Sequence, residues 1–237
     1  MGFLKRILRN STTDEYSRQT PGSFEALTDE DLQIHMGICT YDTFELTDAI
    51  RPSYDVQIKP RQGFRYDEYV DDATKSRTPV IMASATRRRL MELFMELIEP
   101  LGQVVDVALE SSHSVQAAQA DLYREHIDMP VLKSTLWEFE DLLLNDGCTG
   151  IAVINPAKKQ EVQLDEHKLL IAYGEPLDWF REVLIDGDVY PDSNLKFITE
   201  AEHVHSSSER CFDRFSVLKN RLGMDGESCD DGEAGAW

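Results

Sequence analysis

The sequence predicts an α/β or α+β fold, a mixed β-sheet flanked by helices in one compact domain with mobile ends. Strand-like apolar runs alternate with helix-spaced ones along the chain, most clearly in residues 79–109. There a buried strand over 79–84 precedes an amphipathic helix over 86–99, and Val104–Leu109 is the next strand. They would form a βαβ unit if the two strands run parallel. With 237 residues, 41% of them hydrophobic, the chain is long enough to bury a core.

The elements before this unit are shorter. Apolar and polar residues alternate over 31–40 and again at Tyr54, Val56 and Ile58, which predicts two half-buried strands. A short helix is expected between them, over 44–50. The charged and aromatic stretch 59–78 is predicted to be a long loop.

The elements after the unit alternate between helices and strands. The strand pattern over 161–173 changes parity around Asp165-Glu166-His167, and this predicts a bulge or tight turn there, because a strand cannot switch faces without an irregularity. The other predictions are a weak helix over 114–126, a strong helix over 131–145, a strand over 151–154 joined to the next by a hairpin, a helix over 176–185, a strand over 195–199 and a closing helix over 208–222.

The two ends differ from the body in charge and composition. Residues 1–23 read as a basic amphipathic arm and linker, 24–223 as a single α/β domain, and 224–237 as an acidic disordered tail. In the arm, one apolar face is a candidate docking surface for a partner protein, a membrane surface or the acidic body itself. It consists of Phe3, Leu4, Ile7 and Leu8.

The charge of the chain limits its partners. A formal net charge of −20 repels phosphate backbones, so we expect no nucleic-acid binding and a protein partner that is basic. The four cysteines have neither zinc-ribbon nor disulfide-framework spacing, which favours reduced thiols and a cytoplasmic location. The sequence predicts no particular oligomeric state.

A first candidate site follows the strand at 79–84. Thr86, Arg87, Arg88 and Arg89 open the next helix, and a helix N-terminus with three arginines is a candidate anion-binding site. Because the chain contains 44 acidic residues, pairing of these arginines with carboxylates is the alternative.

A second candidate site is a metal site. His203 and His205 would share a face in an extended segment, as two ligands of one divalent metal require. Glu110, Glu202 or His113 would complete three protein ligands. Separately, His113 and His167 are candidate acid–base catalysts, His167 because it lies at the parity change. The alternative is that these histidines are loop residues bonded to carboxylates.

Two hypotheses of function follow. The first is a non-enzymatic interaction or regulatory protein without a cofactor, because no catalytic motif is legible and both ends are candidate docking segments. The second is an enzyme or ligand-binding domain that uses a metal or phosphate site at the carboxyl ends of the strands. Mimicry of nucleic acid by acidic rows is a third, less favoured, because the carboxylates lack regular spacing.

Overall fold

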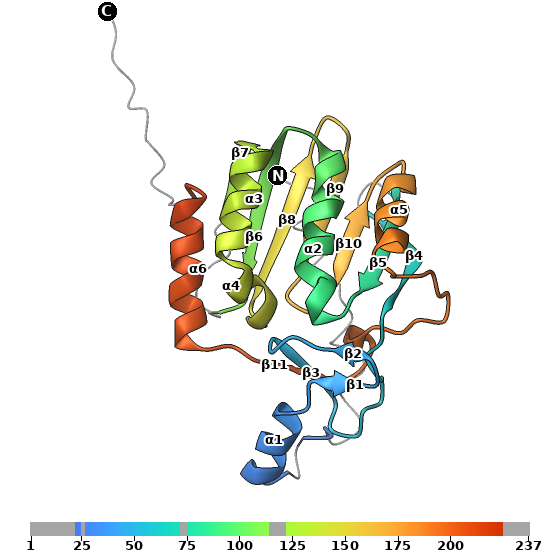
Figure 1. Ribbon diagram of the computed structural model, residues 1–237, viewed down its shortest axis with the longest axis vertical. Helices are drawn as coiled ribbons and strands as arrows, with labels where there is room; N and C mark the ends of the chain where they lie inside the picture. Colours follow the sequence, from blue (N-terminus) through green and yellow to red (C-terminus); the bar gives the residue numbers. More distant parts are fainter. Residues whose placement is uncertain (1–21, 25–26, 72–74, 114–121, 225–237) are drawn as a thin grey trace, which may run out of the picture.

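A seven-stranded sheet forms the centre of the protein. The computed structural model describes residues 22–24, 27–71, 75–113 and 122–224. In this part of the chain the strand order is β4-β5-β10-β9-β8-β6-β7, and all neighbouring strands are antiparallel (Figure 1). The chain is thus a mixed α/β protein, as the sequence predicts. The strands are β4 (Gly63–Val70), β5 (Arg77–Ser84), β6 (Val104–Ser111), β7 (Leu122–Asp128), β8 (Thr149–Asn155), β9 (Gln160–Leu164) and β10 (Leu170–Tyr173).

Helices cover one face of the sheet, and the main core lies between the two layers (Figure 1). Helix α2 (Arg87–Ile98) buries seven apolar side chains, including Leu93 and Phe94. Burying each such side chain contributes about 1.5–3 kcal/mol relative to leaving it in water. The other helical elements of the body are η3 (Glu99–Leu101), α3 (Met129–Glu138), α4 (Glu140–Asn145), α5 (Asp178–Asp186) and α6 (Glu209–Arg221).

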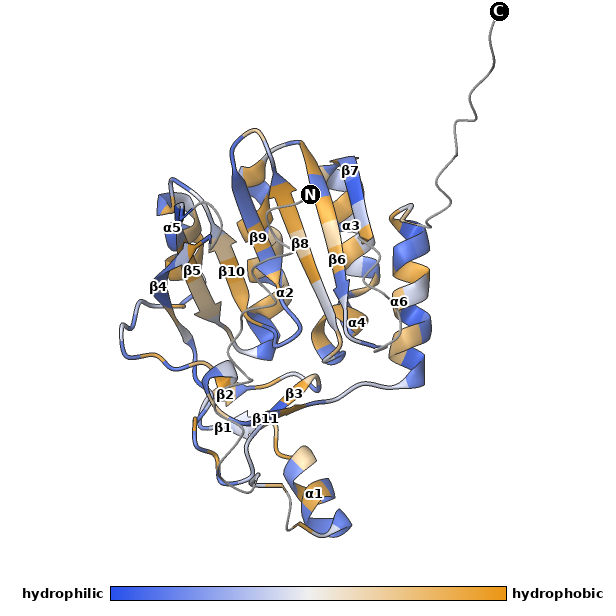
Figure 2. Cartoon of the chain, turned by 180° about the vertical axis from the view of Figure 1, so that it is seen from behind, coloured by the Kyte–Doolittle hydropathy of each residue, from blue (hydrophilic) through white to orange (hydrophobic). Residues whose placement is uncertain are grey.

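The opposite face of the sheet carries a smaller apolar cluster, in which Leu195 and Phe197 pack with Val80 and Ile171. Figure 2 views the molecule from this side, with the strands in front of the helices and β8 largely hydrophobic. Among the described residues, every helix is too short or too polar to cross a lipid bilayer.

A small layer adjoins one edge of the sheet. It contains α1 (Asp29–Met36), the hairpin β1 (Thr40–Tyr41) with β2 (Phe44–Glu45), and the ladder of β3 (Ile50–Pro52) with β11 (His203–His205). The short helix η4 (Ile198–Glu200) precedes β11. Ile198 and Ile50 share a cluster with Phe44, so these segments pack as one unit.

Several predicted elements agree with the structure. The strand and helix over 79–99 correspond to β5 and α2, and the next strand to β6. The strong helix over 131–145 is two helices, α3 and α4, separated at Phe139, whose φ of −109° leaves the helical region. The strand over 161–173 is divided by a tight turn at the predicted parity change, and the helix over 208–222 is α6, capped by Ser208.

The predictions for the first part of the chain are mostly wrong. Residues 31–40 contain the end of helix α1 instead of a strand, because Thr28 and Asp31 form a capping box that starts a helix. Residues 44–50 contain β2, a turn and the first residue of β3 instead of a helix. Asp42, at φ 53°, turns the chain into the β1–β2 hairpin. The strand predicted at 54–58 is a bend, in which Val56 has φ 50° and the Ser53 hydroxyl accepts the Gln57 N–H.

Three further predictions are corrected by long-range pairing. The loop predicted over 59–78 contains β4, which pairs with β5 along its whole length and is rich in strand-favouring aromatic residues. The described end of the helix predicted over 114–126 is strand β7, paired with β6; residues 114–121 lie outside the described residues. The strand predicted over 195–199 is irregular chain followed by η4, and the nearby strand is β11.

Candidate metal centre

Three strands of the sheet end at the same edge. Four antiparallel steps separate β5 from β6, and two separate β5 from β9, so all three run in the same direction. β5 and β6 are therefore parallel, as the βαβ prediction supposed, but three strands lie between them. Their carboxyl ends are followed by Thr86, the turn 165–168 and the segment 110–113, which therefore lie at the same end of the sheet. We call this the site edge, and the β3–β11 ladder lies beside it (Figure 1).

The β3–β11 ladder orients two histidines. His203 and His205 are two positions apart in an extended strand, so their side chains lie on the same face. Val204, between them, is opposite Arg51 of β3 and belongs to the other face. The sequence expectation that the two histidines share a face agrees with this arrangement.

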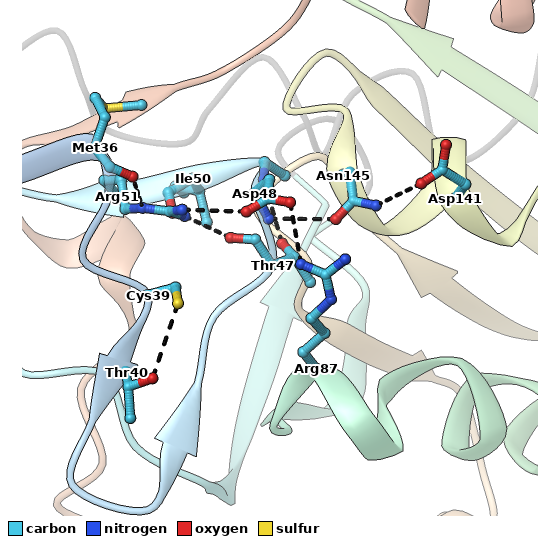
Figure 3. Close-up of polar contacts among 11 residues, drawn as sticks. Met36, Cys39, Thr40, Thr47, Asp48, Ile50, Arg51, Arg87, Asp141 and Asn145 are labelled. Atoms are coloured by element: carbon cyan, nitrogen blue, oxygen red, sulfur yellow. Dashed lines mark hydrogen bonds and ion pairs between the residues drawn. The ribbon is translucent and has the colours of Figure 1, made fainter. Parts of the chain in front are cut away.

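Arg51 fixes β3 in this position. Its side chain is 4% exposed, and its guanidinium lies 3.3 Å from the Asp48 carboxylate. A buried guanidinium needs partners for its five N–H groups, and here most of them are backbone carbonyls. Figure 3 shows these donations, which go to the carbonyl groups of Met36, Thr47 and Ile50.

Asp48 then connects β3 to two helices. Its carboxylate accepts a hydrogen bond from Arg87 of α2 at 3.1 Å, and its backbone N–H donates to Asn145 of α4 at 3.4 Å (Figure 3). Asn145 is held in turn by Asp141. These contacts tie the small layer to the helices that cover the sheet.

Gly147 allows the chain after α4 to approach β11. A Cβ atom at this position would collide with the carbonyl of Ala49 and would lie 2.9 Å from the carbonyl of Ser206. The Gly147 N–H donates to the Ser206 carbonyl at 2.8 Å, and the Ser206 N–H donates to the Ala49 carbonyl at 2.8 Å. Glycine is required here because only a residue without a side chain fits between the two backbones.

His167 joins the two histidines of β11. We call His167, His203 and His205 the histidine cluster: one ligand nitrogen from each lies within 4.8 Å of the other two, and all three residues are half-buried. The ring centroids are 4.7–5.2 Å apart. Zinc is bound by histidine nitrogens at about 2.0–2.1 Å, so small side-chain movements bring the three nitrogens onto one ion.

In all three histidines the same ring nitrogen, Nδ1, contacts an oxygen of a neighbouring residue. Nδ1 of His203 contacts the Ala201 carbonyl at 2.8 Å, and Nδ1 of His205 contacts the Gly147 carbonyl at 2.5 Å. Nδ1 of His167 lies 2.9 Å from the Asp165 carboxylate. These oxygens can only accept, so each Nδ1 is the donor, and in the neutral imidazole Nε2 then carries the lone pair. Metal-binding histidines have this same outer hydrogen bond, which fixes the tautomer and the ring orientation.

The electrostatic surroundings differ between two of these imidazoles. Burial lowers the pKa of His203, and the neighbouring imidazoles of His167 and His205 lower it further, which favours the neutral form that binds metals. Burial also acts to lower the pKa of His167. The carboxylates of Asp165 and Glu166 outweigh that effect and raise it.

Acidic groups gather beside the histidine cluster. Burial, together with the charges of Asp165 and Glu166, raises the pKa of Glu110 to about 7. The Ser112 hydroxyl donates to the Glu166 carboxylate at 2.8 Å and thereby orients it. In the same turn the ammonium of Lys168 is buried and donates to the Thr149 carbonyl at 2.7 Å. Burial lowers the pKa of Lys168 to about 8.

The other predicted site residues lie elsewhere. Among the described residues, the third member of the histidine cluster is His167, and Glu110 and His113 do not belong to it. At the start of α2, Arg87, Arg88 and Arg89 pair with Asp48, Glu45 and Glu92. The Thr86 hydroxyl accepts the Glu45 N–H at 3.0 Å. The docking residues Phe3, Leu4, Ile7 and Leu8 lie outside the described residues.

Sequence reasoning identified each histidine of the cluster but did not unite them. The HxH pair indicated a metal, and the parity change at 165–167 placed His167 at an irregular position. Their convergence depends on the β3–β11 ladder, for which no local pattern existed. Asp146 and Cys148 were missed as site residues.

Comparison with known proteins gives no relative for this chain. No family model, no curated protein and no solved structure matches it.

Proposed function

We propose that the protein binds Zn²⁺ through the histidine cluster and uses it in a hydrolytic reaction. The observation that supports this most strongly is the set of three Nδ1 hydrogen bonds, which leaves Nε2 available as a ligand in three residues that each place one ligand nitrogen within 4.8 Å of the other two. Surface histidines that only solvate the chain need no such common orientation.

A set of three histidine ligands is typical of a catalytic zinc site. Structural zinc sites are closed by four protein ligands, whereas catalytic sites use three and keep one position for water. Within the described residues the cluster supplies three, all of them half-buried and none sealed from solvent. Three histidine ligands would therefore leave a bound zinc ion one position for water.

His167, His203 and His205 would hold the zinc ion, and a bound zinc ion would supply an activated water near neutral pH, because the pKa of zinc-bound water is about 7. Glu166 is suited to take the proton from that water, because its charge reaches both His167 and His203 and its carboxylate is oriented by Ser112. Asp165 holds the imidazole of His167 in the ligand tautomer.

The test of metal binding is elemental analysis of the purified, untagged protein after loading with Zn²⁺. We expect His203→Ala/His205→Ala to lose about one equivalent of zinc per chain. His126→Ala is the matched control, because the side chain of His126 is 80% exposed and lies outside the histidine cluster. Equal zinc in the double variant and the parent would refute the proposal.

The test of reactivity separates binding from chemistry. We expect the zinc-loaded protein to hydrolyse p-nitrophenyl acetate, an activated ester that is a common probe of hydrolytic activity. Glu166→Gln keeps the side-chain shape, so zinc content should stay unchanged while the rate falls about 10²-fold, the usual effect of losing a general base. Unchanged hydrolysis in Glu166→Gln would exclude this residue as the base.

The interaction hypothesis is a separate proposal that rests on the ends of the chain. Its test compares the pelleting of the full chain and of a chain lacking residues 1–10 with anionic vesicles. Affinity capture with both ends intact and with both removed tests for a basic protein partner. The arm docks on a membrane only if its removal reduces pelleting, and equal pelleting excludes that role.

A further inference from the structure

A second group of ligand-type side chains lies at the site edge. We call His113, Asp146 and Cys148 the thiol cluster, since one ligand atom from each lies within 4.8 Å of the other two. His113 follows β6, and Asp146 and Cys148 lie between α4 and β8. The hydrolytic reaction proposed above uses none of them.

We infer that the thiol cluster is a second metal site, selective for a borderline or soft divalent cation such as Zn²⁺. Imidazole, carboxylate and thiolate are all ligands of zinc. A thiolate in the set disfavours Mg²⁺ and Ca²⁺, which prefer oxygen ligands.

The strongest observation is the unsatisfied nitrogen of His113. Its Nε2 is buried and lies 2.8 Å from an oxygen of Asp146, yet the two atoms lack hydrogen-bond geometry. The His113 side chain is 7% exposed, and a buried polar atom without a partner is costly. Two ligand atoms that lie side by side without facing each other are arranged as neighbouring ligands of one ion.

The surrounding residues hold this arrangement. The imidazole of His113 packs against Phe212 and Phe215 of α6, at ring-centroid distances of 5.6 and 5.7 Å. The Asp146 carboxylate is fully buried and accepts hydrogen bonds from the Cys148 N–H and the Thr149 hydroxyl. Ligand carboxylates in metal sites are oriented by such second contacts.

The local charge favours a cation. Lys168 is the buried cation of this region, and its ammonium is within electrostatic reach of the carboxyl groups of Asp146, Asp165 and Glu166. Three carboxyl groups in this region thus stand against one buried ammonium. A divalent ion at the thiol cluster would offset this excess.

A nucleophilic thiol is the alternative function for the same residues. It would require a histidine nitrogen within hydrogen-bond distance of the sulfur. In the described residues, Nε2 of His113 lies 2.8 Å from an Asp146 oxygen without hydrogen-bond geometry, and Nδ1 lies 3.4 Å from the Ser207 hydroxyl. No hydrogen bond from either nitrogen to Cys148 is found among the described residues, so metal binding fits this geometry better than thiol catalysis.

Binding at the thiol cluster needs no oxidant or reductant. The Cys148 S–H bond breaks, its proton passes to solvent, and the sulfur electron pair forms the bond to the metal. The site is also connected to the histidine cluster through Gly147, whose carbonyl accepts the Nδ1–H of His205. An ion held by Asp146 and Cys148 would fix the peptide that orients His205.

The test is titration of the reduced, metal-free protein with Co²⁺, followed by absorption spectroscopy. Cobalt bound to a thiolate has an intense sulfur-to-metal charge-transfer band in the near ultraviolet, which cobalt bound only to histidines lacks. We expect this band and about two bound equivalents per chain. Cys148→Ser should abolish the band and one equivalent, whereas the matched variant Cys211→Ser should keep both.

The double variant His203→Ala/His205→Ala distinguishes the two sites. It should lose one equivalent of cobalt and keep the charge-transfer band. If the parent binds one equivalent with the band, and this double variant is unchanged, the thiol site stands and the histidine site falls. Absence of the band from the parent, or its persistence in Cys148→Ser, overturns the inference; the parent result does not depend on the folding of any variant.

Discussion

Glu161 is an acidic residue in the buried centre of the sheet. It is 5% exposed on β9, where Gln163 donates a hydrogen bond to its carboxyl group. Burial raises the pKa of Glu161 from 4.5 to about 8, and the nearby Glu110 adds to the rise. The folded chain therefore keeps a proton on Glu161 over a pH range in which the unfolded chain releases it.

This pKa shift predicts a pH dependence of stability. Between pH 4.5 and about 8 the folded state binds more protons at Glu161 than the unfolded state, so the free energy of unfolding falls as pH rises. Glu161→Gln removes this dependence, and we expect it to stabilise the protein by a few kcal/mol at pH 8, about 1.4 kcal/mol for each unit of the shift. Urea unfolding at a series of pH values measures both effects.

The matched control for this prediction is Glu182→Gln, because the side chain of Glu182 is 64% exposed on α5. Its unfolding free energy should follow that of the parent at every pH. A Glu161→Gln variant whose stability depends on pH as strongly as the parent's would show that Glu161 ionises normally in the folded chain.

Gly147 gives a second prediction at the scale of one residue. A methyl group there collides with the Ala49 carbonyl, so Gly147→Ala must push the segment after α4 away from β11. We expect the zinc affinity of the histidine cluster to fall by about 10–100-fold, the usual cost of disturbing an outer-shell contact. Gly37→Ala is the control, because a Cβ atom at position 37 would come no closer than 3.3 Å to another atom, a carbonyl oxygen of α1. Equal zinc affinity in Gly147→Ala and the parent would contradict the assigned role of Gly147.

Among the elements, the β3–β11 ladder decides whether the histidines of β11 reach His167. Arg51 holds β3 through the carbonyls of three residues and through Asp48, without touching any imidazole ligand atom. It is therefore a positioning residue. Removing a buried, bonded charge leaves several carbonyls without donors, which destabilises the local fold.

We expect Arg51→Gln to weaken zinc binding by about 10-fold or more while the sheet remains folded. Loss of Arg51 displaces β3 and with it β11, which disturbs the outer hydrogen bonds of His203 and His205, and one such bond is worth about 10–100-fold. Isothermal titration with Zn²⁺ and far-ultraviolet circular dichroism measure the two properties. Arg88→Gln is the control, because Arg88 is 83% exposed and makes a single ion pair with Glu45. Parent-like affinity in Arg51→Gln would mean that β11 is held by other contacts.

The same elements show how far the sequence predicts this fold. The patterns of β5, α2, β6 and α6 are long and regular, so local periodicity was enough to assign them. The strand prediction for residues 31–40 was wrong because apolar alternation and a helix-start signal overlap there. The capping box of Thr28 starts helix α1. β4 and β7 are strands because they pair with β5 and β6, and no local pattern in their own sequences predicts that pairing. Tertiary contact overrides local propensity in such segments.

The candidate centre was predictable in its parts but not as an assembly. HxH spacing and the parity change at 165–167 both follow from local rules. The meeting of these two segments requires a ladder between Pro52 and His203, which are 151 positions apart. The thiol cluster depends on the pairing of β6 with β8, which sets Ser111 opposite Thr149 and which no periodicity encodes.

At the scale of the whole molecule, the dominant property is a formal net charge of −20. Like charges repel in the compact state more than in the expanded unfolded chain. Salt screens this repulsion, with a Debye length of about 10 Å at 0.1 M. It also weakens surface ion pairs, but exposed pairs such as Arg210 with Asp141 contribute little to stability.

We therefore expect the melting temperature to rise with KCl concentration. Each kcal/mol of relief raises it by roughly 2–4 °C in a domain of this size. Differential scanning calorimetry in KCl and in tetramethylammonium chloride separates screening, which both salts provide, from specific K⁺ binding. A melting temperature that falls with either salt would show that attractive ion pairs outweigh the self-repulsion.

The β3–β11 ladder also sets an order of events during synthesis. The seven-stranded sheet is complete at Tyr173, whereas His203 and His205 emerge from the ribosome at least 30 residues later. Until then β3 has no partner strand, and Ile50, fully buried in the finished protein, lacks its β11 partner His205. A nascent chain thus holds a nearly finished sheet with an unfinished histidine cluster. If zinc binds as proposed, loading through all three imidazoles would mark a chain that extends past His205, because a chain stopped before residue 203 has the sheet without the two histidines of β11.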